Sequence, residues 1–145
     1  MSVYMKKSRH AFTLIELLVT ISIIGVLSML ALVAVNAVRE AGRDAKRKTD
    51  LETIRTALEL YKADAGVYPT SPLSTSITYE TKIYLASVPT DPTTGRIYLY
   101  SRPTTATYYL CVALEGATTA VNCASGSGSV YCGGTTPCTY ETSNP

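Results

Sequence analysis

An uninterrupted apolar run, residues 12–38, constrains this chain more than any other feature. It extends for 27 positions and contains a single charged residue, Glu16. A helix needs about 20 apolar residues to cross a bilayer, so the run is long enough to span one. The apolar core of a secretory signal peptide is usually only about 7–15 residues long, and no A-x-A-like cleavage site closes this run. We therefore expect a retained, single-pass transmembrane helix.

The helix is predicted to continue through residues 39–65, because no helix breaker follows the apolar run. One apolar stripe at helical spacing is formed in this second half by Leu51, Ile54, Leu58 and Tyr61. Gly66, followed by Tyr68 and Pro69, supplies a stop signal. We expect one helix from about residue 12 to 64, whose stripe packs under a small domain.

The remainder, residues 66–145, is rich in Thr, Ser, Gly, Pro and Tyr. Strand-like runs lie at residues 77–85, 96–101 and 107–115, with a weaker one at 129–132. The predicted class is α+β, with a small antiparallel sheet on the amphipathic half of the helix. The expected segments are 1–11 (leader), 12–38 (membrane), 39–65 (amphipathic helix) and 66–145 (β domain).

All four cysteines lie in the last 35 residues: Cys111, Cys123, Cys132 and Cys138. An even number in a segment that would be exported indicates two disulfides in an oxidising compartment, and four free thiols in a cytosolic protein are the alternative. A zinc site is disfavoured because there is no C-x-x-C pair and no nearby histidine. Three connectivities are available; we favour Cys111–Cys123 with Cys132–Cys138, since both loops are local.

Composition argues against an enzyme. The only histidine is His10, so the rest of the chain cannot form a Ser-His, Cys-His or His-metal site. We expect no catalytic residue, no metal and no cofactor. The net charge of +2 includes three cations in the first eleven residues, which leaves ten basic against eleven acidic side chains. That balance predicts no nucleic-acid partner.

The segment Lys6-Lys7-Ser8-Arg9-His10-Ala11-Phe12-Thr13-Leu14-Ile15-Glu16-Leu17 closely resembles the class III leader of type IV pilins and type II secretion pseudopilins. In that family a short basic leader, here with Lys6, Lys7 and Arg9, precedes F-T-L-I-E-L. The resemblance implies cleavage by a prepilin peptidase between Ala11 and Phe12, and N-methylation of Phe12. It implies a structural subunit, first in the cytoplasmic membrane and then in a periplasmic or extracellular filament. The implied partners are copies of itself, the peptidase and a pilus or secretion assembly platform.

Two later segments extend the resemblance with less specificity. They are Leu60-Tyr61-Lys62 with Gly66-Val67-Tyr68-Pro69, and the Val88-Pro89-Thr90-Asp91-Pro92 segment with Gly95 and Tyr98. The second is similar to a proline- and glycine-bearing loop of major pseudopilins.

Glu16 needs a charged partner, because a carboxylate in an apolar segment costs about 2.5–3.5 kcal/mol at the membrane centre. Cleavage would create a complementary α-amine at Phe12. A carboxylate that meets the amine of a neighbouring subunit would fix the stagger of a filament, and we interpret Glu16 as this assembly residue. The alternative is that Glu16 only reaches the membrane surface.

Three departures from the family pattern bear on function. Alanine replaces the usual glycine at position 11, which predicts slower processing or a tolerant peptidase. The second half of the apolar run lacks the proline of many pilins. Major pseudopilins often bind calcium through acids in a C-terminal loop, but residues 125–145 contain only Glu141, so we predict no calcium site. The last point shifts weight slightly from type II secretion toward a pilus or DNA-uptake filament.

The basic group Arg43, Lys46, Arg47 and Lys48 has two interpretations: a solvated helix surface, which we favour, or salt bridges between subunits. Its position outside the cell runs against the usual bias of Lys and Arg toward the cytoplasm. Two other functions remain open for the chain. It could be an anchored exported domain that never polymerises, or an adhesin-like minor subunit that binds through its tyrosine-rich strands.

Overall fold

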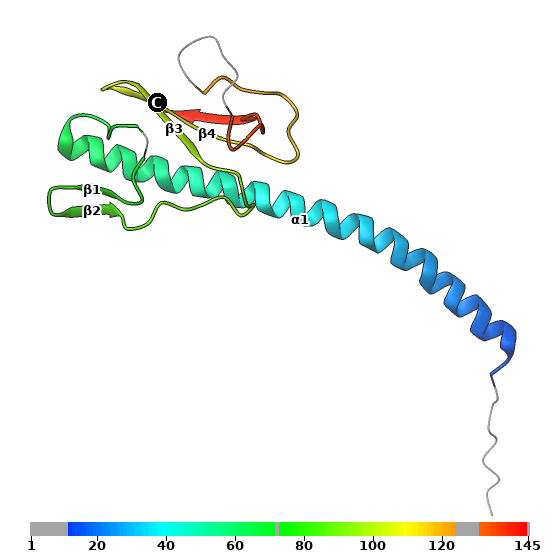
Figure 1. Ribbon diagram of the computed structural model, residues 1–145. Coiled ribbons are helices and arrows are strands. Elements are labelled where there is room, and N and C mark those ends of the chain that lie inside the picture. The colour runs from blue at the N-terminus through cyan, green and yellow to red at the C-terminus, as the bar shows by residue number, and fades with distance from the viewer. Residues whose placement is uncertain (1–11, 72, 124–130, 145) are drawn as a thin grey trace, which may run out of the picture. The chain divides into compact units, whose positions relative to one another are not determined.

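A computed structural model describes residues 12–71, 73–123 and 131–144 of the 145-residue chain. Its elements are helix α1 (Leu14–Ala65) and strands β1 (Ile77–Tyr79), β2 (Lys82–Leu85), β3 (Leu99–Thr104), β4 (Thr107–Val112) and β5 (Tyr140–Ser143), as Figure 1 shows. The chain divides into two compact units, Met1–Val38 and Arg39–Pro145. We call the described part of the second unit the body.

Helix α1 is continuous for 52 residues, close to the predicted range of 12 to 64. It ends where the sequence predicted a stop. Gly66 adopts a φ of 76° and donates its N–H to the Lys62 carbonyl at 2.8 Å, which closes the last turn. A left-handed residue at this position is typical of helix C-termini, and glycine adopts it without a steric penalty.

The predicted strand at residues 77–85 is a hairpin instead. Strands β1 and β2 pair antiparallel, with Tyr79 opposite Lys82. The turn places Glu80 at a φ of 52°, which is uncommon for a residue other than glycine. Glu80 lies between two β-favouring stretches and gives no glycine or asparagine turn signal, so the sequence pattern read as one strand.

The second sheet has the order β3-β4-β5, with both pairs antiparallel. Strands β3 and β4 were predicted, although β3 begins at Leu99 rather than residue 96 and β4 ends at Val112 rather than 115. Strand β5 was missed because its four residues, Y-E-T-S, lack an apolar alternation. Of the weak strand expected at 129–132, residues 129 and 130 lie outside the described residues, and Tyr131 forms an isolated bridge with Pro137.

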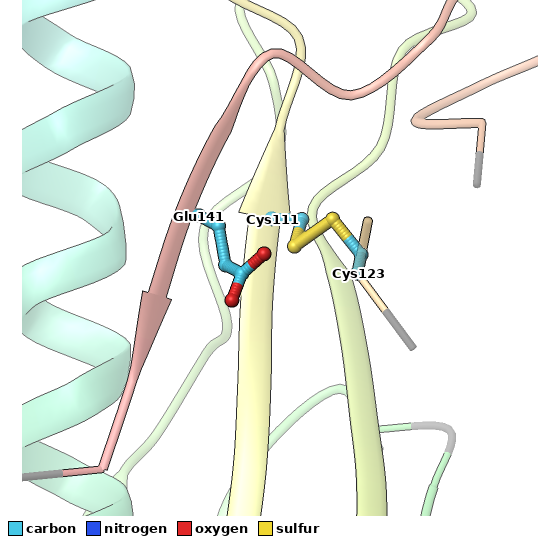
Figure 2. Close-up of side chains that lie close together, drawn as sticks. All are labelled: Cys111, Cys123 and Glu141. Carbon is cyan, nitrogen blue, oxygen red and sulfur yellow. A yellow bond between two sulfur atoms is a disulfide. The ribbon is translucent and has the colours of Figure 1, made fainter. Parts of the chain in front are cut away.

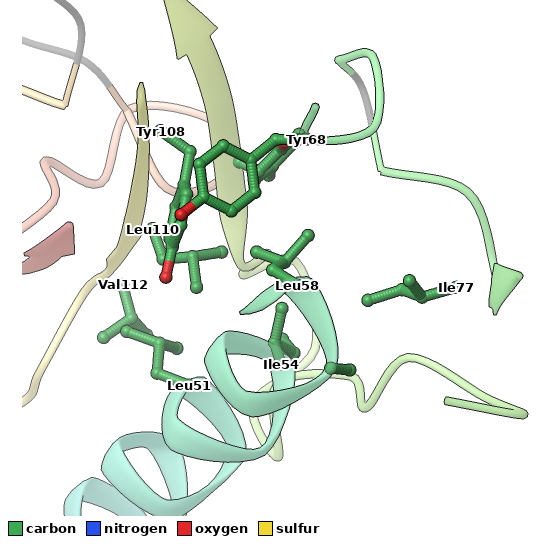
Figure 3. Close-up of a cluster of buried hydrophobic side chains, with 10 residues drawn as sticks. Leu51, Ile54, Leu58, Tyr68, Ile77, Tyr108, Leu110 and Val112 are labelled. Atoms are coloured by element: carbon green, nitrogen blue, oxygen red, sulfur yellow. The ribbon is translucent and has the colours of Figure 1, made fainter. Parts of the chain in front are cut away.

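The hydrophobic core lies between the second half of α1 and the two sheets (Figure 3). Leu51, Ile54 and Leu58 of the predicted stripe are fully buried. Alternate residues of β4 point toward this stripe: Tyr108, Leu110 and Val112. The α+β class is therefore confirmed, with two small sheets in place of one.

Candidate functional site

The start of α1 is a reciprocal cap between Thr13 and Glu16. The Thr13 amide and hydroxyl both donate to Glu16 Oε2 at 2.9 Å, and the Glu16 amide donates to Thr13 Oγ1 at 3.3 Å. This is the capping box of the pattern S/T-x-x-E, in which two otherwise unpaired amides at a helix start find partners. The sequence T-L-I-E carried this signal, but the interpretation of Glu16 as an assembly residue did not use it.

The apolar part of α1 exposes its side chains all round. An 18-residue window has a mean hydropathy of 2.7, and none of it is buried. Its two hydroxyl side chains near the start bond to the helix itself: Thr20 donates to the Leu17 carbonyl at 2.8 Å and Ser22 to the Leu18 carbonyl at 2.7 Å. With these donors bonded internally, the segment suits an apolar environment. By length and composition it could cross a membrane.

Several predicted processing residues lie outside the described residues, namely Ala11 and the leader cations Lys6, Lys7 and Arg9. Phe12, the predicted first residue after cleavage, is 82% exposed and precedes the helix by two positions. Its nitrogen is in a peptide bond in this uncleaved chain, so the amine that would pair with Glu16 does not yet exist.

A second polar site lies in the body and is centred on Arg47, whose side chain is fully buried. Its guanidinium contacts three carboxylates. It donates two bonds to Asp91, at 2.8 and 2.9 Å, one to Asp44 at 2.7 Å and one to Glu115 at 2.8 Å. A further bond to the Thr93 hydroxyl at 2.8 Å completes the cluster.

This arrangement corrects both interpretations of the basic group at Arg47. The residue is neither solvated nor free to bridge subunits, because its donors are bonded within one body. It joins α1 to the loop between β2 and β3, through Asp91 and Thr93, and to the segment after β4, through Glu115. The bidentate geometry toward Asp91 is the strong form of the Arg–carboxylate pair.

Electrostatics keeps this cluster ionised. Hydrogen bonds from Arg43, followed by those from Arg47, lower the pKa of Glu115 to about 2. Burial would raise the pKa of Asp91, but the bonds from Arg47 and the Thr93 amide outweigh it and hold that pKa below its usual range. The bonds to Asp91 likewise raise the pKa of Arg47.

Asp44 and Arg43 extend the cluster along α1. Asp44 accepts the backbone amides of Glu115, at 2.9 Å, and of Gly116, also at 2.9 Å. Arg43 pairs with Glu115 through two donors. One turn of the helix therefore anchors the segment that leaves β4. The partners are 44 to 72 residues apart in sequence, so no local pattern could reveal them.

Three tyrosines of the β domain pack their rings inward. Tyr68 and Tyr108 are buried edge-to-face, with ring centroids 4.6 Å apart, and both hydroxyls donate to Glu59 of α1. Burial and Glu59 raise the pKa of Tyr68 to about 12. The hydroxyl of Tyr100 donates to the Pro69 carbonyl at 2.7 Å. These three tyrosines support the fold, which weakens their interpretation as an exposed binding face.

Two disulfides tie down the C-terminal part of the body. Cys111 is joined to Cys123 and Cys132 to Cys138, the pairing that the local spacing favoured. All four half-cystines are fully buried. Glu141 of β5 lies beside the first disulfide (Figure 2), with its carboxylate within 4.8 Å of the sulfurs. The sulfurs of Cys111 and Cys123 are bonded to each other, so this group offers no thiolate to a metal.

The C-terminal segment has few of the carboxylates through which major pseudopilins often bind calcium. Calcium takes about six to eight oxygen ligands, several of them carboxylates. Residues 125–145 contain one acid, Glu141, which lies against the disulfide. Glu115 is the next acid upstream, and it is bonded to Arg43 and Arg47.

Two family models match the sequence. Residues 6–32 match "Prokaryotic N-terminal methylation motif", and residues 34–122 match "Type II secretion system (T2SS), protein G". The first match covers the second half of the predicted leader and most of the apolar run. The second covers more than half of the chain. It includes the Arg47 cluster and Cys111 of the first disulfide, and it ends one residue before Cys123.

Curated relatives agree with these matches. The chain is 32% identical over 112 residues to the type II secretion system core protein G of Vibrio cholerae serotype O1, covering 68% of this chain and 76% of that protein. It is 30% identical over 109 residues to the protein of the same name from Escherichia coli K12, covering 66% and 73%. A third, from Aeromonas hydrophila, is 33% identical over 66 residues, or 46% of each chain. No solved structure matches significantly.

These comparisons correct the slight preference for a pilus or DNA-uptake filament that the missing calcium acids suggested. The matching relatives are core proteins of type II secretion. The chain belongs to the type II secretion system protein G family, whose members are structural pseudopilins rather than enzymes.

Proposed function

We propose that this chain is a structural subunit of a type II secretion pseudopilus. A prepilin peptidase cleaves it between Ala11 and Phe12, and Phe12 is then N-methylated. Before assembly the apolar part of α1 anchors the subunit once in the cytoplasmic membrane. Copies then leave the membrane and pack helix against helix on a secretion assembly platform. The leader match at residues 6–32 and the family match at 34–122 support this proposal.

The position of Glu16 carries the proposal. It is the only charged residue between Phe12 and Val38, and its apolar neighbours are exposed, with Ile15 at 68% and Leu17 at 60%. Packing those neighbours against other helices would remove Glu16 from water. A buried carboxylate then requires a partner, because an unpaired buried charge costs about 3–5 kcal/mol. The α-amine that cleavage creates on an adjacent subunit has the required charge.

The capping box gives Glu16 a resting state before assembly. In the uncleaved chain its carboxylate is held by the Thr13 amide and hydroxyl. Those bonds use Oε2, and Oε1 has no hydrogen bond among the described residues. The Oε1 atom of Glu16 is therefore held in place at the helix start and can accept a hydrogen bond from the new amine of a Phe12. Pairing between subunits would not require breaking the cap.

Two substitutions separate capping from charge pairing. Glu16→Gln removes the charge but keeps at N3 a side chain with an oxygen acceptor, which a capping box accepts as either Glu or Gln. Thr13→Ala removes the cap hydroxyl and leaves the carboxylate, at a cost of about 0.5–2 kcal/mol in helix stability. Each variant is expressed with the secretion machinery. Membrane insertion is measured by carbonate extraction, and filament formation by shearing and electron microscopy.

We expect both variants to insert, Thr13→Ala to assemble, and Glu16→Gln to fail in assembly. Filaments of Glu16→Gln at the wild-type level would overturn the pairing. Failure of both variants would assign the role of Glu16 to the cap. If the wild-type chain inserts without forming filaments in any condition, the anchored-domain alternative replaces the proposal.

A further inference from the structure

Five cations follow directly on the apolar segment of α1: Arg39, Arg43, Lys46, Arg47 and Lys48. The body neutralises two of them. Arg47 is buried among three carboxylates, and Arg43 forms a two-donor pair with Glu115. The proposed pseudopilin function gives no role to the other three. Their expected position outside the cytoplasm also runs against the usual distribution of Lys and Arg around a membrane span.

The three remaining cations are exposed on the surface of the helix. Among the described residues, Arg39 and Lys46 have no ion pair or hydrogen bond through their side chains. Lys48 lies over the ring of Tyr140, with its ammonium 5.5 Å from the centroid. That contact supports the stem of Lys48 without neutralising its charge.

Their distribution around the helix identifies the shape of the partner. Residues 39 and 46 are seven positions apart, so they lie on one side of α1. Lys48 is offset from Lys46 by about 200° at 100° per residue, so it lies on the opposite side. A small ligand or a single protein face would meet one side only. A layer that surrounds the helix would meet both.

A phospholipid headgroup layer has this shape and the complementary charge. Arg39 follows Val38, which is 71% exposed and is the last apolar residue of the segment. A helix that leaves a bilayer at Val38 carries Arg39 into the headgroup region, which is about 5–7 Å thick on each side. Lys46 and Lys48 follow about 12–15 Å along the axis, within about a Debye length of the anionic lipid phosphates that attract Lys and Arg.

We propose that Arg39, Lys46 and Lys48 bind anionic phospholipid headgroups of the outer leaflet before assembly, while the subunit is anchored in the cytoplasmic membrane. This inference rests on the proposed function for its orientation, with the leader on the cytoplasmic side. Arg43 and Arg47 are not part of this lipid-binding group, because their guanidinium groups are bonded to carboxylates of the body. The cations therefore divide by role: two fix the fold of the body, and three contact the membrane surface.

The test compares lipid retention by three full-length chains. Wild type, the triple variant Arg39→Gln/Lys46→Gln/Lys48→Gln and a control triple variant are purified in mild detergent. The control, Arg55→Gln/Lys62→Gln/Lys82→Gln, loses the same charge farther along the chain. Each is mixed with equal amounts of phosphatidylglycerol and phosphatidylcholine of matched acyl chains. Native mass spectrometry counts the bound lipids, and tyrosine fluorescence verifies that each body is folded.

We expect wild type and control to prefer phosphatidylglycerol, and the triple variant to lose at least ten-fold of that preference. About five-fold is the usual contribution of one Lys or Arg near an anionic membrane surface, so three approach roughly 100-fold at most. Molar salt should abolish the preference, since the Debye length falls to about 3 Å. A wild type with no preference, or an equal loss in the control, would overturn the inference and leave these cations to protein partners.

Failure of this inference is distinguishable from failure of the proposed function. If the wild-type chain shows no lipid preference, its cleavage, membrane insertion and assembly can still be measured, and these decide the proposed function independently. A chain that fails to insert into vesicles of either lipid would overturn both, because headgroup contact requires the anchor.

Discussion

Replacement of Arg47 by glutamine should be the most destabilising single change in the polar part of the body. The variant removes a guanidinium that is fully buried and leaves a smaller, uncharged polar side chain in its place. It leaves Asp91, whose side chain is also fully buried, without its cationic partner, and it exposes Asp44 and Glu115 to mutual repulsion.

The expected cost follows from that geometry. Breaking a buried ion pair by removing one partner typically costs about 3–5 kcal/mol, because the remaining charge is desolvated and unpaired. Small domains are stable by only about 5–15 kcal/mol, so the loss is a large fraction of the total. With a urea m-value of about 2 kcal/mol/M, the midpoint should fall by about 2 M.

Urea unfolding of the full-length chain in mild detergent measures this change. The chain has eleven tyrosines and no tryptophan, so tyrosine fluorescence reports on the body, where Tyr68 and Tyr108 are buried. Arg55→Gln is the matched control. Arg55 meets Glu52 at 3.7 Å on the helix surface, and such pairs contribute about 0–1 kcal/mol.

Equal stability of Arg47→Gln and Arg55→Gln would mean that the buried ion pairs of Arg47 contribute no more than a surface pair. A second variant tests whether the loss is electrostatic: Arg47→Met combined with Asp91→Leu removes both members of the bidentate pair. Replacing a buried ion pair by apolar residues is often neutral or better. The double variant should therefore be more stable than Arg47→Met alone, and a purely additive loss would argue against an electrostatic origin.

Three further predictions concern the body. The pKa of Glu115 falls to about 2 in the folded state from a usual value near 4.5. The stability that this ionised carboxylate contributes is therefore complete above pH 4.5 and is lost as the pH falls through 2. Urea midpoints measured between pH 6 and 2 should reveal a loss of about 1–3 kcal/mol, which should be much smaller in Glu115→Gln. Gly133→Ala should destabilise the Cys132–Cys138 loop, because an added Cβ would lie 2.1 Å from the Gly95 carbonyl oxygen and 2.8 Å from the Arg96 Cα. Hydrogen exchange should show faster opening of that loop, and unchanged exchange rates would contradict this close contact. Glu80→Gly should stabilise the β1–β2 hairpin by about 0.5–1 kcal/mol by removing the positive-φ strain, and a lower urea midpoint would contradict this.

The features predicted from sequence are those whose physics is local. The apolar run, the stripe of Leu51, Ile54 and Leu58, and the stop at Gly66 each depend on residues within a few turns of one another. The disulfide pairing was also favoured by locality, because its loops have separations of 12 and 6 residues.

The features missed depend on distant partners or on weak signals. The burial of Arg47 depends on Asp91 and Glu115, which approach it only when the loops fold onto α1. Strand β5 forms because β4 offers an edge to pair with, not because its own sequence favours a strand. The Thr13–Glu16 cap was detectable in the sequence as T-L-I-E, but both interpretations of Glu16 concerned its charge and neither concerned capping.

The intact mass of the protein, extracted from membranes of cells that contain a prepilin peptidase, shows whether the chain is processed as a pseudopilin. We expect the mass of residues 12–145 with one added methyl group, and a gain of four hydrogens on reduction of the two disulfides. A full-length chain without methylation would contradict this expectation, because Phe12 would have no free amine for Glu16 to meet.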